Sequence, residues 1–557
     1  MKSFSKKLLI FVAVMAVVAG AGWFGRKAYK KTMERRLVSQ SREYLAKKDF
    51  HNASLSLQRA LEMNPVSVSA TEAMADLLDN ADSPAALNWR MRAAKLDPKN
   101  SSKRFQWAEM AIKANDLASA AEALDGADAE AKNTAVYHKL KGALAWSEHN
   151  AATANEEYLA AARLEPQNLA IQINLATIGL ASTNPAVEQA ARASLQQIAT
   201  NANMRLNALH KLLADAIVRK SVRDAVSYSA QIVKDPGSIF KDKIEYLELL
   251  RQDRTQDYGP WLASLEKDAG TSSDHAFELA RWKVVTSGPT NAFHWLAGLP
   301  PQVRTNMPVP LVMTDCQLAM KDWAGILKEV ETQDWGEAGF YQLALQSLAE
   351  RSLSQNTAAD ASWHKAFRAA AHNLDKLSHL AEVTKAWGWQ PECSELLTEI
   401  VGEFPQENWA IDELGAQLYA QGKTSQMESL YFRAYSKDPS NPSIKNNLAN
   451  LYLLRKIELG KAHTMAKEAY DSSTNNPFFI STYAYSLLLQ DKKNEALNVV
   501  SGLKAEYLKI PSVALYYGVV QAESGRKEAA REALKRAEAG KLLPEEKAIA
   551  QLAESRM

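Results

Sequence analysis

The sequence predicts an all-α protein assembled from repeated helical hairpins, and three observations lead to this fold class. The chain has 557 residues, of which 46% are hydrophobic and 23% charged, a composition typical of folded proteins at a length that exceeds one compact domain. Apolar residues follow helical spacing along most of the chain, and no useful length shows the alternation of a β-strand. Similar proline-containing phrases recur, namely ALEMNPVS, AAKLDPKN, AARLEPQN and AYSKDPSN. Such recurrence favours an array of repeats.

Residues 8–25 are predicted to form a transmembrane helix. This segment, LLIFVAVMAVVAGAGWFG, contains no charged residue, and as an α-helix it would extend over ~27 Å, close to the thickness of a bilayer core. A short basic tail over residues 1–7 precedes it, and a cluster of lysines and arginines follows it between residues 26 and 36. The pattern favours a single-pass membrane protein.

A cleaved signal peptide is the alternative for this segment. Ala19, Gly20 and Ala21 provide the small residues of a cleavage site. The apolar sequence continues through Trp23 and Phe24, however, and dense positive charge follows directly, which favours a retained anchor. Both flanks are basic, so the charge pattern leaves open whether the remainder of the chain faces the cytoplasm or the exterior.

The recurring prolines define a repeat in which small residues occupy the places where two helices must approach closely. When each proline takes the same place in its unit, Ala53 and Ala60 precede Pro65, while Gly142 and Ala154 precede Pro166 in the same register. The copy that ends at Pro439 carries the most complete set of large and small residues: Leu414, Gly415, Leu418, Tyr431 and Ala434. Small side chains allow two antiparallel helices to pack closely, and proline ends the second helix.

These residues resemble the tetratricopeptide-repeat (TPR) family, although Met427 fills a small position in the most complete copy. The resemblance implies a TPR-type α–α superhelix that binds other proteins, with an N-terminal array over residues 26–236 and a C-terminal array over 374–540. Between them, residues 237–373 are predicted to form degenerate helical repeats, because GPTNAFHWLAGLPP and TNMPVPLVM interrupt the pattern. Residues 541–557 are expected to be a tail or a capping helix.

The chain also resembles, in outline, membrane-anchored bacterial TPR proteins that regulate envelope assembly. One such group carries a C-terminal zinc module with paired CxxC motifs, whereas the final segment here, GKLLPEEKAIAQLAESRM, contains no cysteine. Only the architecture is therefore carried over. It implies a membrane-tethered scaffold of a bacterial inner membrane, in envelope biogenesis, secretion or polysaccharide export.

Candidate peptide-binding residues lie on first helices of the repeats, which face the concave side of such a superhelix. The helix that begins at Pro442 places Asn446, Asn447 and Asn450 on this side, and a side-chain amide can pair with both the carbonyl and the N–H of an extended peptide. In peptide-binding TPR proteins asparagines occupy similar positions, and Asn174 matches one of them in an earlier unit. Aromatic walls are expected from Trp409, Tyr419 and Tyr485. The alternative is that these asparagines are consensus residues facing solvent.

Catalytic, cofactor-binding and metal-binding residues are not expected. The ten histidines and two cysteines lack zinc-site spacing, and neither a phosphate loop nor a GxSxG motif occurs. The nearest group of histidines is His364, His372 and His379. The formal net charge is +2, so nucleic acid is not an expected partner. The sequence thus favours a protein-binding, non-enzymatic role, and the alternative is an enzyme or enzyme subunit with a site within residues 237–373.

Overall fold

The computed structural model describes residues 29–557 except 48 and 82, and every regular element in this part of the chain is helical. The predicted all-α fold is therefore confirmed. The basic tail at 1–7 and the expected transmembrane segment at 8–25 lie outside the described residues. Among the described helices, none is both long and apolar enough to cross a bilayer. The chain divides into two compact units, Met1–Ala269 and Gly270–Met557, with the division inside the segment predicted to contain degenerate repeats.

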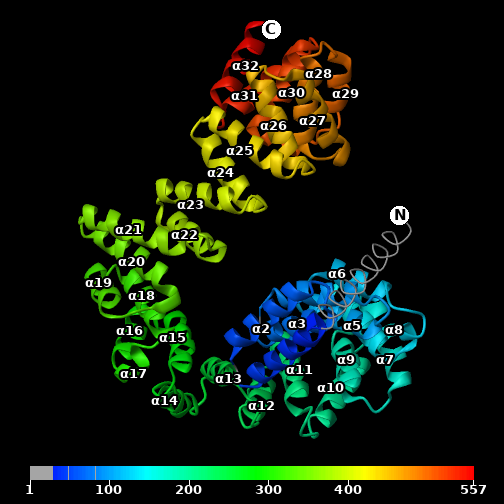
Figure 1. Cartoon of the computed structure of the whole chain (residues 1–557), viewed down its shortest axis with the longest axis vertical. Helices are drawn as coiled ribbons and strands as arrows, with labels where there is room; N and C mark the ends of the chain where they lie inside the picture. The colour runs from blue at the N-terminus through cyan, green and yellow to red at the C-terminus, as the bar shows by residue number, and fades with distance from the viewer. Residues whose placement is uncertain (1–28, 48, 82) are drawn as a thin grey trace, which may run out of the picture. The chain divides into compact units, whose positions relative to one another are not determined.

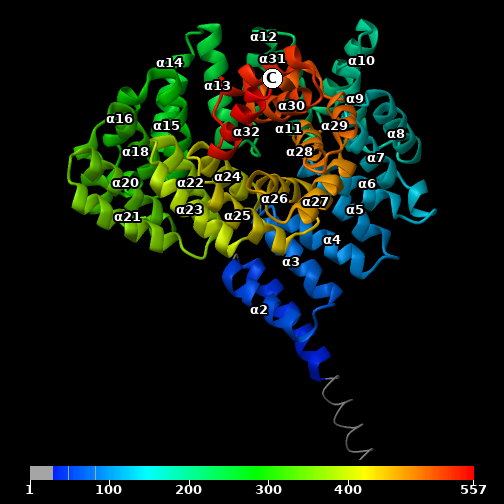
Figure 2. The same cartoon turned by 90° about the horizontal axis from the view of Figure 1, so that it is seen from above.

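In the first unit, residues 29–46 are helical and consecutive helices after them pair as hairpins. The hairpins include α3–α4, α5–α6, α7–α8, α9–α10 and α11–α12, and neighbouring hairpins lie side by side in both views (Figure 1, Figure 2). The elements are α2 (Phe50–Met63), α3 (Val68–Asn80), α4 (Ala86–Leu96), α5 (Ser101–Lys113), α6 (Leu117–Asp125), η1 (Ala131–Asn133), α7 (Ala135–Ser147), α8 (Ala151–Leu164), α9 (Leu169–Leu180), α10 (Pro185–Ile198), α11 (Arg205–Val218), α12 (Val222–Ile232), α13 (Phe240–Asp253) and α14 (Tyr258–Ala269).

The second unit continues the same pairing and ends in a single helix, α32, that packs on α30, α31 and α26. Its hairpins are α15–α16, α18–α19, α20–α21, α22–α23, α24–α25, α26–α27, α28–α29 and α30–α31. The elements are α15 (Ser273–Ser287), α16 (Pro289–Ala297), α17 (Pro301–Arg304), α18 (Val309–Met320), α19 (Trp323–Thr332), η2 (Gly336–Ala338), α20 (Gly339–Ser352), α21 (Asn356–Ala370), α22 (Leu374–Trp387), α23 (Gln390–Glu403), α24 (Asn408–Ala420), α25 (Thr424–Lys437), α26 (Pro442–Arg455), α27 (Leu459–Ser472), α28 (Pro477–Leu488), α29 (Lys493–Val500), η3 (Ala505–Lys509), α30 (Pro511–Glu523), α31 (Lys527–Glu538) and α32 (Pro544–Ser555).

The recurring prolines act at the ends of second helices. Pro65 and Pro439 each follow directly after the C-cap residue of a helix, α2 or α25, and Pro98 and Pro166 do the same after α4 and α8. The C-cap residue before each proline has left the helical conformation, with φ near −130° to −143° and positive ψ. This follows because the proline ring disfavours helical torsions in the residue before it.

Close helix approach within the hairpins depends on the small residues. A Cβ added to Gly142 would lie 3.0 Å from Tyr158 Cδ2, and one added to Gly518 would lie 2.9 Å from Leu534 Cγ. Ala53 and Ala154, which occupy the corresponding small position of the second helices α2 and α8, are fully buried. The hairpin packing that the TPR resemblance implies is therefore present in both units. In the second unit a continuous apolar core extends from Ala344 to Ala553.

Candidate functional site

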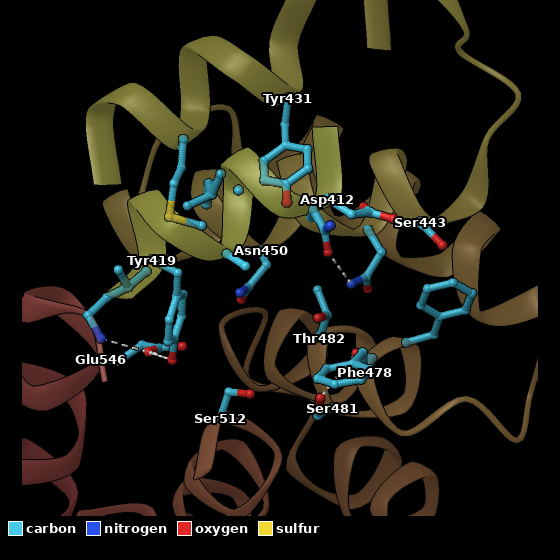
Figure 3. A pocket seen from close by; sticks show the side chains of 18 of the residues that line it. Asp412, Tyr419, Tyr431, Ser443, Asn450, Phe478, Ser481, Thr482, Ser512 and Glu546 are labelled. Carbon is cyan, nitrogen blue, oxygen red and sulfur yellow. Dashed lines mark hydrogen bonds between the residues drawn. The ribbon is translucent and has the colours of Figure 1, made fainter. Parts of the chain in front are cut away.

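A pocket of about 490 Å³ lies within the second unit, lined by the first helices α24, α26, α28 and α30, by the second helix α25 and by the terminal helix α32. Side chains of α24, α25 and α26 line one side, and those of α28 and α30 line the other (Figure 3). Helices α26, α28 and α30 contact one another in sequence, and α32 contacts both α26 and α30. The pocket therefore combines residues from segments that are more than a hundred positions apart in the chain.

Three asparagines of α26 line the pocket over just over one helical turn. The helix starts at Pro442, where Asn441 caps it by accepting hydrogen bonds from the backbone N–H groups of Ser443 and Ile444. Asn446 is buried, its Nδ2 donates to Asn447 Oδ1 at 3.4 Å, and its own Oδ1 has no hydrogen-bond partner among the described residues. Asn450 Oδ1 accepts from the Tyr516 hydroxyl at 2.6 Å. The half-buried Asn447 thus offers its amide to the pocket, whereas Asn450 also supports α30.

Helix α32 contributes a fully buried carboxyl group, Glu546, to the pocket lining. Its Oε2 accepts from the Tyr419 hydroxyl at 2.6 Å and from the Leu543 backbone N–H at 2.9 Å (Figure 3). Its Oε1 has no hydrogen-bond partner in the described part of the chain. The Thr424 hydroxyl donates to Glu545 at 2.6 Å, which attaches α32 to α25 at a second point.

The pocket is acidic and partly apolar. Burial raises the pKa of Glu546, and the hydrogen bonds from Tyr419 and from the Leu543 N–H oppose this effect without cancelling it. Partial desolvation raises the pKa of Asp412 on the pocket wall. Burial raises the pKa of Tyr419, and the nearby Glu546 carboxyl raises it further. Burial also raises the pKa of Tyr431 to about 12. Both tyrosines therefore act as neutral hydroxyl groups at physiological pH.

The structure brings four of the seven predicted binding residues together and places three elsewhere. Tyr419 lines the pocket together with the three asparagines of α26. Tyr485 is buried on α28 and is not among the pocket-lining residues; its ring lies 4.9 Å from that of Tyr516. Trp409 is exposed outside the pocket, with its Nε1 donating to Glu407 at 3.0 Å. Asn174 lies on α9 in the first unit.

Glu546 and Tyr516 are among the pocket residues that were not predicted from the sequence. Tyr516 lies between Ala514 and Gly518 in an apolar stretch of α30, where the sequence indicates an ordinary core residue. Glu546 does carry a signal, because Leu543, Ala550 and Ala553 repeat at helical spacing and place a carboxylate within their apolar stripe. A charged residue on a buried face calls for a partner or a function.

Comparisons with known proteins were made by sequence and by structure. No protein-family model and no curated protein sequence matches this chain. Among solved structures it is similar to PilF of Pseudomonas aeruginosa, with 19% identity and a TM-score of 0.30 over 40% of this chain and 99% of that one. It is also similar to a tetratricopeptide repeat protein of Parabacteroides merdae (12% identity, TM-score 0.29, 51% of this chain and 99% of that one). A third similar structure is that of the APC/C hetero-tetramer Cut9–Hcn1 (12% identity, TM-score 0.26, 83% and 98%). At these levels of similarity the likenesses carry no argument about function.

The alternative prediction is an enzyme site within residues 237–373. This segment borders a second pocket of about 700 Å³, whose lining includes Glu331, Asp334 and Lys376. Partial burial raises the pKa of Glu329 in the same segment, but Glu329 does not line this second pocket. The three histidines are separated: His364 lies on α21, His379 on α22, and His372 between the two helices. Within the described residues, no group of three histidine, cysteine or carboxylate side chains could hold a metal ion. No observation in this segment favours a particular reaction.

Proposed function

We propose that this protein is a membrane-tethered TPR-type scaffold that binds extended segments of other proteins in the pocket between α24 and α32 and catalyses no reaction itself. The observation that carries the proposal is the arrangement of Asn446, Asn447 and Asn450 along one pocket wall, opposite the polar and aromatic side chains of α28 and α30. The tether rests on the apolar, uncharged sequence of residues 8–25. We place its role at a bacterial-type membrane, in envelope biogenesis, secretion or polysaccharide export.

The chemistry of the wall suits a peptide backbone. An extended peptide presents an N–H and a C=O at each residue, and a side-chain amide can bind both. Asn447 is half-buried and lines the same pocket as Ser443, Ser481 and Thr482. The volume of about 490 Å³ lies within the ~300–1,000 Å³ of typical ligand pockets, so it suits a short stretch of peptide.

Asn447→Ala tests this proposal with less disturbance of the packing than a change at Asn450. Asn447 Oδ1 accepts one long hydrogen bond, from Asn446 of the same helix at 3.4 Å, whereas Asn450 Oδ1 accepts from the Tyr516 hydroxyl of α30 at 2.6 Å. The full-length chain is purified from native membranes, and its partners are quantified by mass spectrometry. Loss of the hydrogen bonds of one amide, each worth ~1 kcal/mol, should reduce retention of specific partners roughly five- to tenfold.

Asn498→Ala is the matched control, because Asn498 is an exposed residue of α29 outside the pocket. It should retain the same partners as the unchanged protein. Equal retention by both variants would contradict peptide binding in this pocket.

A further inference from the structure

The charged residues of the pocket lining are all of one sign. Two of the described residues that line it carry a charge, and both are acidic: Asp412 on α24 and Glu546 on α32. No lysine or arginine occurs among these lining residues, although basic residues are common in the whole chain. An anionic ligand would therefore enter without a compensating charge.

Two buried acceptor atoms at the pocket lack partners among the described residues. Asn446, 3% exposed, has an unpaired Oδ1, and Glu546, 0% exposed, has an unpaired Oε1. Both residues line the pocket, and both atoms accept hydrogen bonds rather than donate them. A buried carboxylate without a positive partner is costly, and this cost falls when a cation binds next to it. The ligand group that complements these two acceptors is thus positively charged and rich in hydrogen-bond donors.

The aromatic residues of the lining favour the same kind of group. Four aromatic residues line the pocket, namely Tyr419, Tyr431, Phe478 and Tyr516. Aromatic faces attract ammonium and guanidinium ions. The aliphatic parts of lysine and arginine side chains can lie against Leu451 and Met427 while the charged ends reach the carboxylates.

We infer that the pocket selects a basic segment of its partner, with a lysine or arginine side chain bound by Asp412, Glu546 and the free acceptor of Asn446. This inference rests on the proposed function and adds the class of segment that the pocket recognises. Arginine has five donors that can serve several acceptors at once, whereas lysine offers a compact charge with three.

Four capped pentapeptides test the inference: acetyl-Leu-Ala-X-Ala-Leu-amide with arginine, lysine, glutamine or glutamate at X. Blocked ends leave X as the single variable charge. Binding to the detergent-solubilised full-length protein is measured by calorimetry. We expect the arginine and lysine peptides to bind roughly tenfold tighter than the glutamine peptide, and the glutamate peptide to bind weakest.

Asp412→Asn and Glu546→Gln should each reduce the preference for the basic peptides. Glu546→Gln preserves the packing, because Tyr419 and the Leu543 N–H donate to the same oxygen and the glutamine carbonyl can accept both hydrogen bonds. Asp412 is exposed, so its change leaves the fold intact. Asp471→Asn removes the same charge from an exposed site on α27 and should leave the preference unchanged.

Equal binding of the glutamine and arginine peptides would overturn the inference while leaving peptide binding itself in place. An equal loss of preference in Asp471→Asn would also overturn it, because the effect would then come from overall charge. If none of the four peptides binds, the inference fails, and the Asn447→Ala comparison decides separately on the proposed function.

Discussion

Single small residues determine how closely the helices of a hairpin approach. Gly415 on α24 faces the ring of Tyr431 on α25, and a Cβ added at Gly415 would lie 2.9 Å from Tyr431 Cζ and still closer to its hydroxyl oxygen. Tyr431 is 5% exposed and lines the pocket, so its ring has little room to move. By contrast, a Cβ added at Gly402 in α23 would have no neighbouring atom within 4 Å.

Two glycine-to-alanine changes should therefore have opposite effects on stability. Gly415→Ala overpacks the hairpin and should destabilise it by about 1–3 kcal/mol. Gly402→Ala should stabilise α23 by about 0.5–1 kcal/mol, because alanine loses less backbone entropy in a helix and Gly402 is exposed. Hydrogen exchange of the amides in α23 to α25 measures both effects. Similar protection in the two variants would show that Tyr431 moves aside at no cost.

At the scale of an element, the docking of α32 completes the pocket. Its amphipathic sequence predicts a helix, and the attachment of this helix depends on Glu545 and Glu546 meeting Thr424 and Tyr419. The titratable groups that face Glu546 are the hydroxyls of Tyr419 and Tyr516 and the carboxyl of Glu545. None of these is a cation, so the charged form of Glu546 is poorly compensated.

Docking of α32 should weaken as the pH rises. The folded-state pKa of Glu546 lies above its ordinary value of 4.5, so the stability it contributes is fully present below that value and is lost as the pH rises through the folded pKa. In Glu546→Gln this loss should be absent. Hydrogen exchange of residues 544–555 in both proteins at the same pH checks this: the two should be equally protected near pH 4, and the variant better protected near pH 8. Lower protection in the variant at every pH would contradict the argument.

At the scale of the whole molecule, the proposed membrane tether is residues 8–25, which lie outside the described residues. A chain that lacks residues 1–28 should move from the membrane fraction to the supernatant after ultracentrifugation, because it loses the segment able to fill ~27 Å of bilayer. Circular dichroism should show unchanged helicity per residue in the remaining chain. Continued sedimentation with membranes would contradict the tether. A mature N-terminus just after Ala21 in the full-length protein would instead support the signal peptide.

The local sequence was sufficient to predict the repeated hairpins and part of the pocket lining. A proline after the C-cap ends a helix, and small residues allow two helices to pack closely. Both effects operate within about one repeat unit, so Pro439 and Gly415 predict a hairpin without knowledge of the rest of the fold. Helical periodicity likewise placed Asn446, Asn447 and Asn450 on one face of α26.

Tertiary structure decided which face of each helix remains accessible. Trp409 and Tyr485 follow the same spacing as pocket residues, yet Tyr485 packs against Tyr516 and Trp409 lies outside the pocket. The hydrogen bond between Tyr419 and Glu546 joins residues 127 positions apart. Repeat patterns describe contacts between neighbouring units. The terminal helix α32 packs on earlier repeats, and only the packed chain brings Glu546 next to Tyr419 and into the same pocket as Asp412.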